Sequence, residues 1–230
     1  MNLLQARTIA GTLSFPSKMP GTAYSLPASK CIIGAKLVRV PGSICHGCYA
    51  ISGRYQWGNA VKAMDHRLAG LNNPKWVEAM IFLLKQKHRH PQFRIDLGKV
   101  KKGQCRWRMN SAGYHRWHDS GDLQGVWHLR KICEVAEGTP KIMHWLATRE
   151  AKMVQDYVAE GGLIPGNLVI RVSATMIDRG PPTSWPLTST VHEKSDPVGH
   201  RCPAPTQNHE CGSCRACWSR DVANVSYEKH

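Results

Sequence analysis

The chain has 230 residues, which is enough for one α/β domain with a hydrophobic core. Hydrophobic residues make up 42% of the chain, but their unbroken runs are far shorter than the roughly 20 residues that cross a bilayer, so we expect no membrane span. Lysine and arginine number 31 against 16 acidic residues, and the resulting net charge of +15 favours a polyanionic partner such as nucleic acid.

The N-terminal third predicts an irregular arm followed by helices. The first thirty residues are rich in serine, proline and glycine and predict no regular element. Residues 35–40 form a short run that is compatible with a strand. Helices are expected over residues 56–69 and from Asn73, a capping residue, to a point before Pro91. The chain opens with no apolar stretch of export-signal length, so we expect a cytoplasmic protein.

The middle of the chain alternates between strand and helix patterns. Strands are expected over residues 93–97, 114–118, 141–147 and 167–173. Helices are expected in the two later gaps, over residues 122–137 and 149–160. This alternation is typical of right-handed βαβ units and a parallel sheet.

We therefore predict an α/β fold, as a partial or distorted (β/α) TIM-like barrel with a Cys-rich C-terminal extension. A single domain is expected over residues 1–230. Residues 1–50 would form the N-terminal arm and a first cysteine loop, and residues 51–178 the βα core. Residues 179–230 would form a Pro-rich and Cys-rich segment, hereafter the tail.

The tail carries the strongest chemical signal, because four cysteines are closely spaced in it. In a cytosolic chain, clustered cysteines bind metal more often than they form disulfides. A C-x2-C-x2-C run with a more distant fourth cysteine matches an iron–sulfur cluster better than the paired C-x2-C knuckles of structural zinc sites. The expected ligands of a [4Fe–4S] cluster, with zinc as the alternative, are Cys202, Cys211, Cys214 and Cys217.

A second group comprises Cys31, Cys45 and Cys48. Three thiols would leave one iron of a four-iron cluster open to an exogenous ligand. With His46 as a fourth ligand, the same group would close a zinc site. A third interpretation buries Cys31 and pairs the other two cysteines with the tail, so the number of clusters, one or two, stays open. Cys133 lies on the apolar stripe of its expected helix and is interpreted as a core residue.

Polar side chains follow the expected strands of the core, where α/β folds concentrate function. We expect His118 and Asp119 to transfer a proton or hold a ligand's amino group, and Arg149 to pair with a carboxylate or phosphate. Ser173, at the end of the last of these strands, is a candidate cofactor-binding residue. The alternative is that Asp119 and Asp122 only cap the following helix.

A basic segment lies between Lys85 and Arg116, where ten lysines and arginines face a single acidic residue, Asp96. Trp107 and Tyr114 are interleaved with them. Such a segment can neutralise backbone phosphates and stack aromatic rings on bases, which favours nucleic-acid contact over a merely solvated basic face.

Several segments together resemble the phage "gene product 88" family, which would place the protein in the cytoplasm of a host cell. The segments are residues 25–28, 41–45, 48–50, 118–122, 148–150 and the Cys-rich end. More distantly, the Cys45-x2-Cys48 pair followed by an aromatic residue and a helix resembles radical S-adenosylmethionine (SAM) iron–sulfur proteins. That resemblance implies SAM as a further cofactor and redox or radical chemistry, here on a nucleic acid. The alternative function is a zinc-stabilised nucleic-acid-binding module without catalysis.

Overall fold

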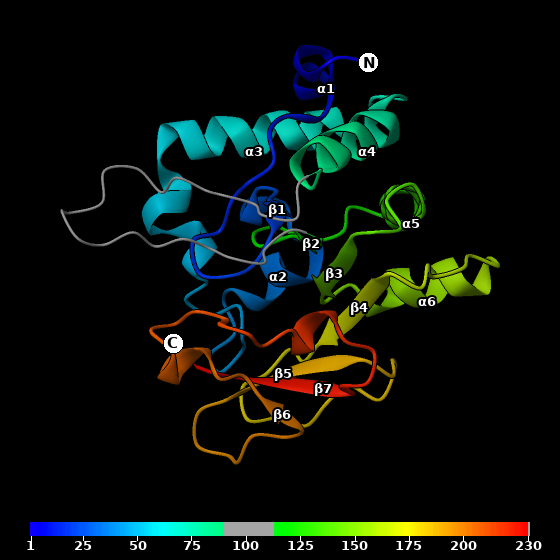
Figure 1. Ribbon diagram of the computed structural model, residues 1–230. Helices are drawn as coiled ribbons and strands as arrows, with labels where there is room; N and C mark the ends of the chain where they lie inside the picture. The colour runs from blue at the N-terminus through cyan, green and yellow to red at the C-terminus, as the bar shows by residue number, and fades with distance from the viewer. Residues whose placement is uncertain (90–112, 230) are drawn as a thin grey trace, which may run out of the picture.

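The computed structural model describes residues 1–89 and 113–229, and a seven-stranded sheet forms its centre (Figure 1). The strands lie in the order β1-β2-β3-β4-β5-β7-β6, and all neighbouring pairs are parallel. Their bounds are β1 Thr22–Tyr24, β2 Tyr114–Trp117, β3 Met143–Thr148, β4 Leu168–Ser173, β5 Thr188–His192, β6 His200–Arg201 and β7 Asn224–Glu228. The predicted α/β class with a parallel sheet is confirmed.

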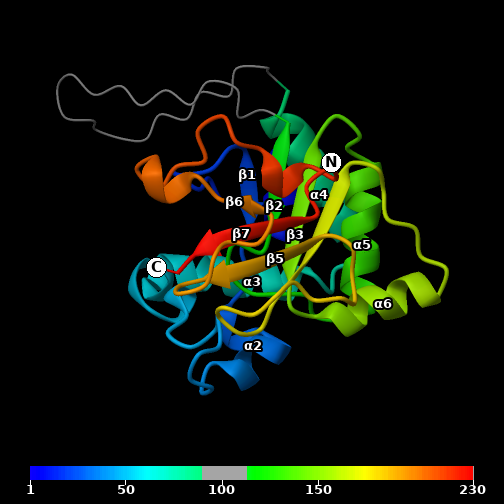
Figure 2. The ribbon, with the colours of Figure 1, turned by 90° about the horizontal axis from the view of Figure 1, so that it is seen from below.

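All of the α-helices except α2 cover one side of this sheet. The α-helices of the described ranges are α1 Leu3–Ala10, α2 Ile32–Leu37, α3 Gly58–Gly70, α4 Trp76–Lys87, α5 Val126–Glu137 and α6 Ala151–Ala159. In both ribbon views α5 and α6 lie side by side along one flank, and α2 lies apart from them (Figures 1 and 2). None of the helices in the described ranges has the length and apolarity that a bilayer crossing requires.

The main hydrophobic core lies between the sheet and these helices, and we call this side of the sheet the helix face. Trp76 and Leu84 from α4 pack there with Leu129 and Ile132 from α5, all of them fully buried. Alternate residues of the strands, such as Trp117 and Leu146, contribute to the same core. The stripe predicted for the helix that includes Cys133 is confirmed, and this cysteine is buried in the core.

The opposite side of the sheet, the tail face, is covered by the C-terminal segment. Arg116, Trp145 and Arg171 alternate with the helix-face residues of β2, β3 and β4 and therefore point to this side. Trp218 from the tail packs against Trp145, with the two ring centroids 5.1 Å apart. The sheet is thus buried on both sides, as parallel sheets require.

Several elements differ from the sequence predictions. The supposed arm contains α1, which begins with a capping box between Asn2 and Gln5, and strand β1. The expected strand over residues 35–40 is wrong, because α2 extends to Leu37. The expected helix start at Asp122 is also wrong, because α5 begins at Val126. The expected strand over residues 93–97 and most of the basic segment lie outside the described residues.

The tail also has more regular structure than expected. It supplies β5, β6 and β7, and β7 lies between the other two. Strands β1 and β6 stand at the two ends of the order, and in the described part of the chain no ladder joins them. The finer prediction of a partial or distorted barrel therefore stays a prediction.

Candidate functional site

The loop with the first three cysteines crosses the carboxyl ends of β3 and β4. The Ile33 amide donates a hydrogen bond to the Glu150 carboxylate, 2.8 Å away and just beyond β3. The Ile44 amide donates to the Thr175 carbonyl oxygen at 2.9 Å, just beyond β4. These bonds hold the loop at the strand ends, where the sequence analysis expected function to gather.

Cys31, Cys45 and Cys48 come together in this loop. A Cβ atom built on Gly34 would lie 3.6 Å from the sulfur of Cys31 and 3.6 Å from that of Cys45, so both sulfurs surround the same point. The pKa of the Cys31 thiol is raised to about 12, first by burial and then by the negative charges of Asp122, Cys45 and Cys48. The guanidinium of Arg149 acts in the opposite direction on the pKa of Cys31. The sulfurs of Cys31 and Cys45 are thus neighbours, and the charges of Cys48 and Arg149 act on both of them.

Asp122 fixes the end of β3 and does not cap α5. Its carboxylate accepts hydrogen bonds from the Thr148 hydroxyl at 2.6 Å and from the Arg149 amide at 2.9 Å. The α5 N-cap is Gly125, which has no side chain to cap with. The capping alternative is therefore wrong for Asp122, because Thr148 and Arg149 use its oxygens.

Asp119 likewise connects elements at the same edge. Its carboxylate accepts hydrogen bonds from the Ser25 hydroxyl at 2.6 Å and from the Tyr55 hydroxyl at 3.3 Å. Its backbone carbonyl accepts a bond from the Tyr49 hydroxyl at 2.5 Å, and Tyr49 directly follows Cys48. Asp119 therefore lies beside the first cysteine loop, with both carboxylate oxygens hydrogen-bonded.

His118 is placed differently from Asp119 and Arg149. Its ring is buried on the helix face, 5.2 Å from the ring of His128, and burial lowers its pKa to about 3. Its backbone has a φ of 61°, a left-handed conformation that turns the chain at the end of β2. Ser173 hydrogen-bonds through its hydroxyl to that of Ser189 at 2.9 Å, on neighbouring strand β5.

The four tail cysteines form a second set, on the tail face. The pKa of the Cys211 thiol is raised first by burial and then by the charges of Cys202 and Cys214. The pKa of the Cys217 thiol is raised to about 12, mainly by burial and also by the charges of Cys211 and Cys202, while the hydrogen bond with Tyr227 acts in the opposite direction. The charges of these cysteines thus act on one another, so the four side chains lie in the same region of the tail face. The eight cysteines in the described ranges are free thiols.

Two polar side chains contact sulfurs of the tail set. The Tyr227 hydroxyl on β7 lies 3.1 Å from the sulfur of Cys217. The Nε2 atom of His200 on β6 lies 3.4 Å from the sulfur of Cys214. The tail strands thus provide hydrogen-bond partners for the thiols.

Arg171 anchors the tail to the sheet. Its fully buried guanidinium donates hydrogen bonds to five carbonyl oxygens, among them Ala216 at 2.8 Å and Ser219 at 2.7 Å. The carbonyl oxygen of Cys217, at 3.2 Å, is another of these five acceptors. Within the described residues no carboxylate pairs with Arg171. A full positive charge is therefore buried next to the tail thiols and is compensated only by carbonyl dipoles.

Neither of the two cysteine sets is arranged as a preformed site for a single metal ion. In residues 1–89 and 113–229, no three or more cysteine, histidine or acidic side chains converge closely enough to hold a single metal ion. Four cysteines on one zinc ion would each bind at about 2.3 Å. A four-iron cluster places its inorganic core between the cysteine sulfurs and therefore accepts a wider set.

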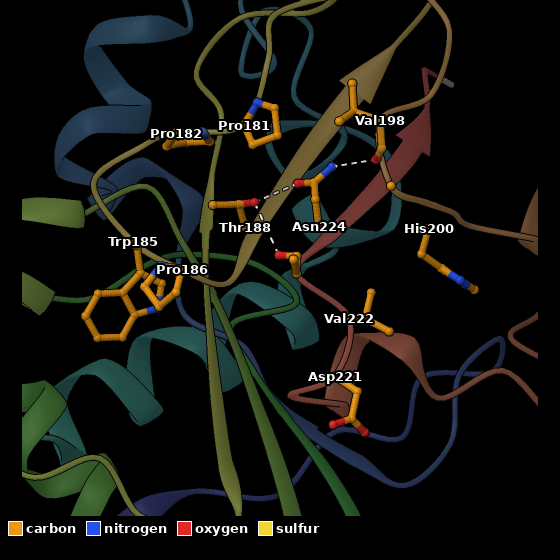
Figure 3. A pocket seen from close by; sticks show the side chains of 12 residues that line it. Pro181, Pro182, Trp185, Pro186, Thr188, Val198, His200, Asp221, Val222 and Asn224 are labelled. Carbon is orange, nitrogen blue, oxygen red and sulfur yellow. Dashed lines mark hydrogen bonds between the residues drawn. The ribbon is translucent and has the colours of Figure 1, made fainter.

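A separate hollow of about 560 Å³ lies at the amino ends of β5, β6 and β7 (Figure 3). The polar groups of Thr188 and Asn224 on its wall are already bonded to each other at 2.8 Å, and Asn224 also donates to the Val198 carbonyl at 2.7 Å. The rest of its wall is mostly proline, tryptophan and valine. The hollow thus lies at the opposite ends of these strands from the carboxyl-end loops and offers few free polar groups.

Sequence reasoning missed Arg171, Arg116 and Tyr227 as site residues. The first had a recognisable signal, because it is the single charged residue in the buried run Leu168–Ser173. Arg116 was counted with the basic segment, yet its guanidinium stacks on the ring of Trp145 at 4.6 Å from the centroid. The remaining cysteine, Cys105, lies outside the described residues.

Comparison with known proteins gives one match. The family model described as Gene product 88 matches residues 2–220. No curated protein and no solved structure matches the chain. The match spans nearly the whole sequence and includes both cysteine sets, in agreement with the closer of the two resemblances stated above, and it establishes that the chain belongs to the Gene product 88 family.

Proposed function

We propose that this protein is an iron–sulfur protein with two [4Fe–4S] sites. Cys202, Cys211, Cys214 and Cys217 would bind one cluster completely. Cys31, Cys45 and Cys48 would bind the other through three of its irons. Two separate sites are favoured over one shared cluster, because every thiol whose charge acts on Cys31, Cys211 or Cys217 belongs to the same set as that cysteine.

The observation that carries the proposal is the buried Arg171 beside the tail thiols. A buried charge without a counter-charge costs several kcal/mol in a folded protein. A cluster held by four thiolates is an anion, and it would supply the negative charge that no described carboxylate supplies. Arg171 also fixes the backbone around Cys217, because it bonds to the carbonyls of residues 216, 217 and 219.

The first cysteine set supports a cluster of a different kind. Its three thiols leave one iron without a protein ligand. Arg149 lies beside these thiols, and its Nε atom is buried with no hydrogen-bond partner in the described residues. An anionic group bound at the open iron would meet this guanidinium. SAM, which carries a carboxylate, is the ligand that the more distant sequence resemblance implies, and it is tested by titration of the reduced protein.

Contact with nucleic acid is a second proposal, and the charge of the chain favours it. The net charge of +15 exceeds what a soluble fold requires. Arg116 does not belong to the proposed contact surface, since it stacks on Trp145. Lys85 and Arg89 are exposed cations of the basic segment and would contact phosphates.

Single-site variants test the two-cluster proposal. Anaerobically purified protein should be brown, with broad absorption near about 400 nm, as thiolate-bound iron clusters are. Cys211→Ser and Cys45→Ser should each remove about half of the bound iron, because each would lose one of two clusters. The matched control is Cys133→Ala, which changes a core cysteine and should keep all of the iron.

Two results would contradict this proposal. Colourless protein with stoichiometric zinc would favour the zinc-stabilised module instead. Loss of all the iron in either single-site variant would contradict two separate sites and favour one cluster shared between the loop and the tail.

A further inference from the structure

We propose that residues 49–57 form a binding platform for single-stranded nucleic acid, on which the exposed rings of Tyr49 and Trp57 stack with bases. This inference rests on the proposed contact with nucleic acid and deepens it, because it names the class of nucleic acid and assigns base contacts to side chains outside the basic segment. It requires no metal at either cysteine set.

The platform carries most of the exposed aromatic surface of the described residues. It consists of two short 3-10 helices, Tyr49–Ile51 and Gly53–Gln56, and leads into α3 at the edge of the molecule (Figure 1). Trp57 is 64% exposed and Tyr49 is 55% exposed. In the described part of the chain one further aromatic residue, Trp127 on α5, is exposed. Exposed aromatic rings that lie close together in this way are typical of an interaction surface.

Asp119 fixes the platform to the rest of the protein. The Tyr49 hydroxyl donates a hydrogen bond to the Asp119 backbone carbonyl at 2.5 Å, and the Tyr55 hydroxyl donates to the Asp119 carboxylate at 3.3 Å. The two tyrosine rings pack edge to face, with their centroids 5.5 Å apart. A platform that is ordered beforehand loses little conformational entropy on binding. Because Asp119 follows β2, a strand stacked on Tyr49 would lie beside the candidate site at the carboxyl ends of the sheet.

The surroundings of the platform leave room for a ligand. At Gly47, Gly53 and Gly58, no described atom outside the neighbouring backbone lies within 4 Å of the position that a Cβ atom would take. The Trp57 ring has no part in the start of α3, because the helix begins with a bond from the Ala60 amide to the Trp57 backbone carbonyl at 2.8 Å. The ring is therefore available for stacking.

The charge around the rings fits a polyanion. The first acidic residue of the chain is Asp65, and all seven lysines and arginines before it are exposed. The Arg54 guanidinium lies over the Trp57 ring, 5.8 Å from its centroid. No described carboxylate forms an ion pair with Arg39 or Arg54. Cations beside aromatic rings suit a single strand, because the cations contact phosphates while the rings stack on bases.

Two other occupants fit the platform less well. A duplex keeps the faces of its bases inside its own stack, so the rings could not reach them. A second copy of the chain carries the same net charge of +15 and would be repelled.

Fluorescence anisotropy of the full chain with labelled oligonucleotides of about 16 nucleotides tests the inference. The probes are a thymidine DNA homopolymer, the matching uridine RNA homopolymer and a DNA duplex of mixed sequence. We expect the duplex to bind more weakly than the preferred single strand, and the two homopolymers show whether that strand is DNA or RNA. Trp57→Ala should weaken single-strand binding by about 5- to 150-fold, which corresponds to the loss of one stacked base. Trp57→Phe keeps a ring and should retain most of the affinity.

Trp127→Ala is the matched control. It removes another exposed tryptophan that lies beside a cation, Lys131, but on a helix that also carries Glu134 and Glu137. Its single-strand affinity should match wild type. Equal losses in Trp57→Ala and Trp127→Ala would overturn the inference, as would unchanged affinity in a Trp57→Ala protein with the circular dichroism of wild type.

An Arg54→Gln variant provides a second measurement. It should lower the slope of log affinity against log salt concentration by about one, because one phosphate contact is lost. An unchanged slope would contradict the platform.

The same probes separate this inference from the proposal on which it rests. Wild-type protein that binds the duplex as tightly as either single strand would overturn the platform but leave phosphate contacts through Lys85 and Arg89 intact. Wild-type protein that binds none of the probes would refute both.

Discussion

Acid should destabilise this protein strongly, because its core contains several neutral histidines. His115 and His144 on the helix face are fully buried, and their ring centroids lie 5.5 Å apart. His144 is bonded to neutral partners, the Trp117 indole at 3.2 Å and the Thr139 hydroxyl at 2.9 Å. No described carboxylate is available to stabilise a protonated ring there. Protonation would therefore place an unpaired charge in the core.

The size of the effect follows from the lowered pKa values. Burial lowers the pKa of His88 to about 4, and that of His118 and His144 to about 3 each. In the unfolded chain the same groups titrate near about 6.5. Above about pH 6.5 these histidines are neutral in both states and do not lower the free energy of unfolding. As the pH falls from there towards the pKa values of the folded protein, the free energy of unfolding decreases. At pH 5 each histidine should cost about 2 kcal/mol, or about 6 kcal/mol for the three.

This loss is comparable to the entire free energy of unfolding of a typical domain, about 5–15 kcal/mol. His115 and His128 act in the same direction, since burial also lowers their pKa values. Urea unfolding followed by circular dichroism at pH 7 and pH 5 measures the difference in the free energy of unfolding.

A pair of variants separates the histidine effect from acid damage elsewhere. His144→Gln removes one buried titratable ring, so the loss between pH 7 and pH 5 should shrink by about 2 kcal/mol. His66→Gln changes an exposed histidine and should leave this loss as in wild type. An equal loss in wild type and His144→Gln would refute the reasoning.

Three further predictions concern the sites and the charge. Asp122→Ala should lower the free energy of unfolding by about 2–3 kcal/mol, because it leaves the Thr148 hydroxyl and the Arg149 amide without their acceptor. Asp122→Asn should lower it by less, and chemical denaturation measures both variants. Tyr227→Phe should keep the iron but lower the reduction potential of the tail cluster, because it removes the hydrogen bond to Cys217. The control Tyr157→Phe, on α6, should leave this potential unchanged, and an equal shift of the potential in both variants would contradict the assignment. Nucleic-acid binding should weaken by about three to five orders of magnitude between 50 and 200 mM salt if six to ten phosphates are contacted; salt-independent affinity would argue against phosphate contacts.

The βα core was predictable because its elements are long and strongly periodic. Strands β3 and β4 and helices α5 and α6 lie within a few residues of the expected ranges. Strand β1 has three residues, and it forms by pairing with β2, where Thr22 lies opposite His115. Such a short element has no periodicity of its own, so no local pattern could predict it.

The tail strands could not be predicted for a different reason. Strand β5 has the sequence Thr-Ser-Thr-Val-His, and its buried positions are polar. The Thr188 and Asn224 side chains satisfy one another across β5 and β7, and only the folded sheet brings them together. Hydrophobic alternation therefore does not mark these strands, although they complete the sheet.

The cysteine spacing grouped Cys31 with Cys45, and the structure brings these two sulfurs together beside Gly34. The complete ligand sets stay a prediction. The charged residues around them were harder to find. Arg116 and Arg171 come from strands distant in sequence from the cysteines, and only the register of the sheet directs both to the tail face. His118 was expected beside Asp119, but its left-handed backbone turns its ring into the core.

The central claim is that the two cysteine sets bind iron–sulfur clusters. Its most direct measurement is the content of iron and acid-labile sulfide in anaerobically purified full-length protein. Two clusters predict about eight iron atoms and about eight sulfide ions per chain. Protein that binds zinc without sulfide, or that binds no metal after reconstitution with iron and sulfide, would contradict the claim.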